Sequence, residues 1–223
     1  MKLKHHKPMV YAGESCSKTG LKRLRDLGWG QCCSEGPTEK QELHWFMDNG
    51  AWAAYVARRE FPGHEFLGRM ERAYERAQQP DFIVLPDVVA DAAATLILAA
   101  HWHPLIPPAW PRYFALQDGV EPWQISDFRT KHPIEGVFIG GTAWFKNEKA
   151  AFWTNWAHER GLKAHYARAG TPRKFEHAMV IGADSLDSSR LSRSGQRWSD
   201  FMRCRELWLN GPRPRLFSED AAA

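Results

Sequence analysis

Short β-rich runs alternate with longer helical stretches along the chain, and this alternation constrains the fold more than any other feature. The runs are Met9–Ala12, Leu43–Met47, Phe82–Leu85, Tyr113–Leu116, Gly136–Ile139, Ala164–Ala167 and Ser185–Leu186. Helical patterns lie over Leu21–Leu27, Ala51–Gln79, Asp91–Trp102, Asn147–Glu159 and Arg173–Val180. Strands separated by helices predict a parallel sheet.

The number of such units selects among parallel folds. Seven or eight strand–helix units favour a closed (β/α)8 TIM-type barrel over an open doubly wound sheet. The chain has 223 residues, fewer than the roughly 250 typical of that barrel, so we expect a compact or reduced one. We predict one domain over residues 1–223, with a basic, aromatic C-terminal segment at about 190–223. No G-x-G-x-x-G or Walker pattern follows the first run, and we expect no cofactor.

Composition excludes several classes of protein. Apolar residues make up 43% and charged residues 25%, which indicates a globular rather than a disordered chain. No apolar run reaches the roughly 18 residues of a membrane-spanning helix, and none follows the basic start of the chain. We therefore expect a cytoplasmic protein with no membrane partner. Four cysteines without a C-x2-C pair predict free thiols and no metal site.

Polar residues follow most of the β-rich runs. They are Asp48, Asp87, Gln117 with Asp118, Gly140 with Gly141, Arg168 and Asp187. A lone Asp after a strand is usually a helix cap or a turn former. Asp48, Asp87 and Asp187 together, accompanied by Gln and Gly-Gly, favour a site instead, because the C-terminal ends of barrel strands carry the catalytic groups.

This set of residues suits a planar, polar ligand such as a nucleobase. Grouped carboxylates allow one to act as a nucleophile and another to carry a proton. Gln and Asp can read the edge of a base, and two glycines let a ligand approach backbone amides. Trp52 and Trp144 follow ligand-side strands and either stack on a base or pack within the protein.

The ordered blocks resemble the tRNA-guanine transglycosylase superfamily, and most of all its short DNA-acting relatives. MDNGAW resembles the family's Asp-Ser-Gly-Gly segment, LPDVV its base-reading strand end, ALQDG its Val-Gln-Gly-Gly and GVFIGGTAW its Gly-Leu-Ala-Ile-Gly-Gly strand. The stretch HYARAGTPRKFEHAMVIGADSLDSS, followed by Arg193-Ser194-Gly195, resembles the family's nucleophile region. The resemblance extends over about residues 48–195.

The resemblance implies a role for each matching residue. Asp187 would be the nucleophile that attacks the sugar C1′, and Asp48 the acid/base. The base would be bound by Asp87, Gln117, Asp118, Gly140, Gly141, Asn49 and Trp144. Such chemistry passes through an oxocarbenium-like state that carboxylates stabilise or trap, and a base in a duplex must first leave the stack.

The sequence also departs from the family. Its tRNA enzymes hold zinc with three close cysteines and a histidine, whereas only Cys204 lies in that region here. We therefore expect DNA as partner, with tRNA less favoured. Asn49 and Asp118 replace family residues, and the segment after Gly141 differs from the one that contacts the incoming base. These changes favour a DNA glycosylase that leaves an abasic site over exchange of guanine for a 7-deazaguanine, and such an enzyme would suit phage defence.

Basic residues near the C-terminus predict contact with a nucleic-acid backbone. Arg168, Arg190, Arg193 and Arg197 stand among aromatic residues, a mixture that suits phosphate contact and base stacking. Arg190 and Arg193 could instead pair with surface carboxylates. Two other functions stay open at this point: a different barrel enzyme, such as a glycoside hydrolase or nucleosidase, and a catalytically inactive nucleic-acid-binding module.

Overall fold

Eight parallel strands close into a barrel in the computed structural model, which describes residues 6–14, 17–33, 43–75, 79–192 and 198–212. Each strand pairs with its neighbour in the chain, and the last pairs with the first. The strands are β1 (Met9–Gly13), β2 (Gly30–Cys33), β3 (Trp45–Met47), β4 (Ile83–Val84), β5 (Arg112–Leu116), β6 (Gly136–Ile139), β7 (Lys163–Tyr166) and β8 (Ser185–Ser188). The predicted (β/α)8 barrel is confirmed.

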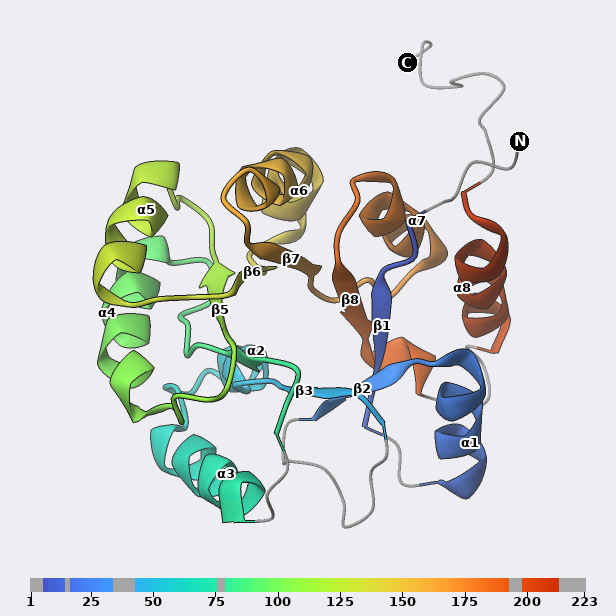
Figure 1. Ribbon diagram of the computed structural model, residues 1–223, viewed down its shortest axis with the longest axis horizontal. Helices are drawn as coiled ribbons and strands as arrows, with labels where there is room; N and C mark the ends of the chain where they lie inside the picture. Colours follow the sequence, from blue (N-terminus) through green and yellow to red (C-terminus); the bar gives the residue numbers. More distant parts are fainter. Residues whose placement is uncertain (1–5, 15–16, 34–42, 76–78, 193–197, 213–223) are drawn as a thin grey trace.

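Helices surround the strands on the outside (Figure 1). They are α1 (Lys18–Leu27), α2 (Ala51–Val56), α3 (Gly63–Glu75), α4 (Ala92–Trp102), α5 (Pro122–Lys131), α6 (Ala143–His158), α7 (Pro172–Val180) and α8 (Trp198–Asn210). Short 3-10 turns lie at His103–Leu105 and Ser189–Leu191. Within the described ranges, no helix has the length and apolar character needed to cross a membrane.

Several elements differ from the sequence prediction. The helix expected over Ala51–Gln79 is two helices, α2 and α3, because Pro62 lies between them and cannot donate the backbone hydrogen bond that a continuous helix needs. Strand β2 was not predicted, since its sequence GQCC lacks β-branched and aromatic residues. Helix α5 was also missed, although Pro122 in its first turn and a capping box between Glu121 and Gln124 mark its start.

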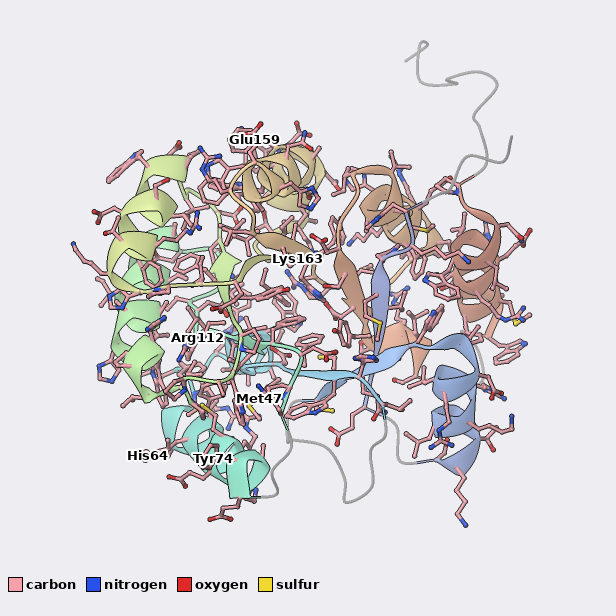
Figure 2. The ribbon with its side chains drawn as sticks, in the orientation of Figure 1. Met47, His64, Tyr74, Arg112, Glu159 and Lys163 are labelled. Carbon is pink, nitrogen blue, oxygen red and sulfur yellow. The ribbon has the colours of Figure 1, made fainter. Side chains whose placement is uncertain are left out.

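Aromatic rings fill the inside of the barrel. Phe46 stacks on Phe82 at a centroid distance of 4.5 Å, and Phe82 stacks on Tyr113 at 4.0 Å. Tyr11 meets Phe46 edge-on, and its hydroxyl donates to Asp81 at 2.7 Å. Side chains occupy the space between the strands in Figure 2, as expected of a barrel that is a packed core rather than a pore. This packing gives the site above it a rigid floor.

Candidate active site

A cavity of about 480 Å³ opens where the strands end at their C-terminal side. Its volume is in the range of small-molecule sites. Phe46 and Phe138 from the barrel interior line it, together with Cys32. Of the predicted site residues, the cavity brings together Asp48, Asn49, Asp87, Gln117, Gly140, Gly141, Arg168, Asp187 and Arg190.

Asp187, on β8, is held by two neighbours through one carboxylate oxygen. The backbone N–H of Arg168 donates to Asp187 Oδ1 at 2.9 Å, and His165 Nε2 lies 3.1 Å from the same atom. The Asp187 carbonyl also accepts from the N–H of Ala169 at 2.7 Å. These contacts fix the carboxylate at the cavity wall, and both contacts to the side chain are made to Oδ1 rather than Oδ2.

His165 is a site residue that sequence reasoning missed. Its side chain is fully buried, its ring stacks parallel to Phe138 at 4.8 Å, and its Nδ1 lies 2.9 Å from Ser185 Oγ. A neutral ring with its proton on Nε2 satisfies both contacts, because Nε2–H then donates to Asp187 and Nδ1 accepts from the Ser185 hydroxyl. His165 is thus a buried support directly beneath the Asp187 carboxylate.

Asp48 follows β3 and faces the same cavity. Burial raises the pKa of its carboxyl, and the negative charge of Asp187 raises it further. The backbone N–H of Gly50 donates to Asp48 Oδ1 at 3.3 Å and opposes this change only in part. Asp48 therefore retains a proton to higher pH than an exposed aspartic acid, as a general acid requires.

Asp87 stands in a different setting, between two side-chain amides. Asn49 Nδ2 donates to Asp87 Oδ1 at 2.6 Å, and Gln117 Nε2 donates to Asp87 Oδ2 at 2.6 Å. Burial nevertheless raises the pKa of Asp87 to about 7. The amides are themselves fixed, because Asn49 Nδ2 also donates to the Leu85 carbonyl and Gln117 Oε1 accepts from the N–H of Ala90. The result is a row of polar groups whose positions are fixed by hydrogen bonds.

The two glycines after β6 support this row. Gly141 has a φ of +67°, and its N–H donates to Gln117 Oε1 at 3.1 Å. The N–H of Gly140 donates to the Leu116 carbonyl. A Cβ on Gly140 would lie 2.9 Å from Gln117 Nε2, so glycine is needed for this close approach. Both amides are therefore engaged within the protein rather than open to a ligand, unlike the expectation from sequence.

Arg168 forms part of the cavity wall. Its guanidinium donates to the Gly141 carbonyl and lies over the Trp52 ring, 3.9 Å from the ring centroid. Its backbone has a φ of +56°, which is rare outside glycine. The buried amine of Lys146 donates to the Ala167 carbonyl at 2.9 Å and secures the chain just before this turn, and burial lowers the pKa of Lys146 to about 7.

Other predicted residues lie away from the cavity lining or outside the described residues. Asp118 accepts from both the N–H and the hydroxyl of Thr142 and so holds the start of α6. Trp144 is 63% exposed and is not among the residues that line the cavity. Arg190, by contrast, does line the cavity, and its Nη1 atom lies 4.0 Å from Asp200 Oδ2. Arg193 and Arg197 fall outside the described residues.

Over the part of the chain that the structure describes, no three His, Cys, Asp or Glu side chains are grouped so that they could hold a metal ion. No protein-family model matches the chain, and no curated protein is similar to it.

Proposed function

We propose that this cavity cleaves the bond between a nucleobase and its sugar in nucleic acid, with Asp187 as nucleophile and Asp48 as acid/base. The observation that carries the proposal is the unlike surroundings of two carboxylates at one cavity. Asp187 receives a backbone N–H and an imidazole, whereas burial and the Asp187 charge raise the pKa of Asp48. Carboxylates in unlike settings are suited to opposite roles.

In the first step, the carboxylate of Asp187 attacks the sugar C1′ while the C1′–N bond breaks. The electron pair of that bond leaves with the base, and Asp48 donates its proton to the departing ring. The sugar carries positive charge in this transition state, and the Asp187 carboxylate stabilises the charge and then forms an ester with C1′.

In the second step, water attacks C1′ and the ester bond to Asp187 breaks. Asp48, now ionised, accepts the proton of the water and returns to its starting form. The products are a free base and an abasic sugar, and both carboxyl groups are regenerated. The protein is then a glycosylase, a class that needs no second base in the cavity.

The row of Asn49, Asp87 and Gln117 is the proposed reader of the base edge. Asp87 accepts from an amide on either side, so its orientation is fixed before a ligand arrives. Its remaining lone pairs can accept from the N–H groups of a base. The Trp52 ring, backed by Arg168, gives a planar wall against which a base can stack.

DNA is the proposed substrate, on the sequence argument that the cysteine cluster of tRNA-acting relatives is missing. The test is a mass-spectrometric assay of free base after incubation with unmodified DNA, DNA bearing modified bases, and tRNA. We expect base release from modified DNA that is lost in Asp187→Asn. Uptake of a labelled 7-deazaguanine without net abasic product would show exchange instead. The absence of both from every substrate would contradict the proposal.

A further inference from the structure

A second cavity, a groove of about 510 Å³, lies between α2 and α4. It shares Asp87 and Val89 with the candidate active site, so the two spaces adjoin behind the base-reading row. Tyr55, Val88 and Trp102 supply apolar surface to the groove, and Arg59 and His101 lie along it. The chemistry proposed above uses none of these five residues.

Two stacked rings connect the cavities. Trp52 lines the active site and Tyr55 lines the groove, and their ring centroids are 5.6 Å apart with an interplanar angle of 29°. The residues are three positions apart on α2, which puts both on one helix face. Arg168 lies over the Trp52 ring, so three planar groups form a column from the active site to the groove.

The end of this column is open to solvent. Tyr55 is 53% exposed and Trp52 is 45% exposed, unusual values for two aromatic rings that contact each other on a short helix. Arg59, also exposed, adds a positive charge beside Tyr55, although Glu60 stands next to it in the same lining. An open aromatic face with a nearby arginine is the arrangement by which proteins bind unpaired nucleotides.

We propose that the groove binds the nucleotide next to the target base, with its base stacked on Tyr55 and its phosphate near Arg59 and His101. This inference rests on the proposed function, because the shared wall at Asp87 places the groove beside the base that is cleaved. It assigns the protein a substrate with unpaired nucleotides around the target, since a base stacked on Tyr55 has left its own helical stack.

The test is binding of a short, fluorescein-labelled single-stranded DNA that contains 5-iodouracil, followed by ultraviolet crosslinking. Tyr55→Ala is expected to weaken binding by roughly 5- to 100-fold, and Tyr55→Phe to retain it, because the ring supplies the stacking. Arg59→Ala is expected to lower the slope of log affinity against log salt by about one. The crosslink is expected at Tyr55.

Tyr74→Ala is the matched control. Tyr74 is 65% exposed and its ring lies 6.4 Å from Trp110, but it is on α3, far out on the barrel's periphery (Figure 2). Equal affinities for wild type, Tyr55→Ala and Tyr74→Ala would overturn the inference, as would the absence of any binding.

The two proposals fail in distinguishable ways. Base release by Tyr55→Ala at the wild-type rate from the same oligonucleotide would refute the groove and leave the glycosylase proposal standing. Binding that depends on Tyr55, without base release from any substrate, would support nucleotide binding in the groove and refute the proposed base cleavage.

Discussion

Two carboxylates of one cavity, Asp187 and Asp87, are held in opposite ways. A backbone N–H and a buried imidazole contact a single oxygen of Asp187. Two amide side chains contact both oxygens of Asp87 from either side. The first arrangement leaves an oxygen able to approach a substrate, whereas the second fixes a planar acceptor. The role of a carboxylate at a strand end is therefore set by its hydrogen-bond partners and not by its position alone.

Removing the charge of Asp187 tests the comparison most severely. In Asp187→Asn, base release is expected to fall by roughly 10⁴-fold or more, because an amide cannot form the ester intermediate. The Asn oxygen still accepts from the Arg168 N–H, so the thermal unfolding midpoint should change little. Rates come from the free-base assay and the midpoint from circular dichroism. Retained activity in a folded variant would rule out the nucleophile role.

Asp48 is expected to show the next largest effect. Asp48→Asn should lower kcat by roughly 10²- to 10⁴-fold, the usual contribution of a general acid. Because burial and the Asp187 charge raise the pKa of Asp48, wild-type activity should fall as pH rises through that pKa and the acid loses its proton. The measurement is the pH–rate profile, and this basic limb should disappear in the variant. If the basic limb of the profile were unchanged in Asp48→Asn, a group other than Asp48 would be responsible for it.

His165 tests whether Asp187 depends on its buried support. His165→Phe keeps a ring against Phe138 but removes the donor to Asp187, and should lower kcat by roughly 100-fold through misplacement of the carboxylate. His165→Gln restores an N–H near the Nε2 position and should recover much of the rate. KM should change little in either variant. Steady-state kinetics give kcat and KM for both variants. An equal loss of kcat in His165→Phe and His165→Gln would indicate that His165 has a packing role alone.

Asp87 links the row of Asn49, Asp87 and Gln117 to stability. Its folded pKa of about 7 lies above that of an unfolded aspartic acid, so the folded state binds more protons between these values. The contribution of Asp87 to the free energy of unfolding is therefore fully present at acid pH and is lost as the pH rises through about 7. Urea unfolding should show a loss of about 2 kcal/mol between pH 5 and pH 7 that is absent in Asp87→Asn.

The Asp87→Asn variant is needed as a reference because other groups also titrate between pH 5 and pH 7. Burial lowers the pKa of His103 and of His177, so these histidines favour the folded state more as pH rises. The difference between wild type and variant isolates the carboxyl. Parallel stability curves for the two proteins would mean that Asp87 is ionised throughout this range.

Much of the site could be predicted because barrel strands bring their C-terminal ends to one face. Asp48, Asp87 and Gln117 each follow an apolar run, and this local pattern is enough to place them at the mouth. His165 could not be found in this way. Its partners are Ser185 and Asp187 on the neighbouring strand, and the β7–β8 register that joins them is a tertiary feature.

The features that the sequence did not reveal depend on contacts between separate segments of the chain. Strand β2 has the sequence GQCC, and its pairing depends on Gly30, where a Cβ would lie 2.5 Å from the His44 carbonyl oxygen. Lys146 lies on α6, and a lysine in a helix is usually solvated; only packing shows that its amine is buried against the Ala167 carbonyl. In each case the deciding contact joins segments that are distant in sequence.

Asp118 gives the smallest expected effect and extends the comparison to a third carboxylate. It follows Gln117 directly, yet its oxygens accept from the N–H and hydroxyl of Thr142 at 2.8 and 2.6 Å, outside the cavity lining. Asp118→Ala should therefore cost about 1 kcal/mol of unfolding free energy, as for a lost helix-start contact, with base release within about twofold of wild type. Urea unfolding and the free-base assay measure the two quantities. A large loss of activity at unchanged stability would return Asp118 to the base-binding set, because only contact with the ligand separates those two effects.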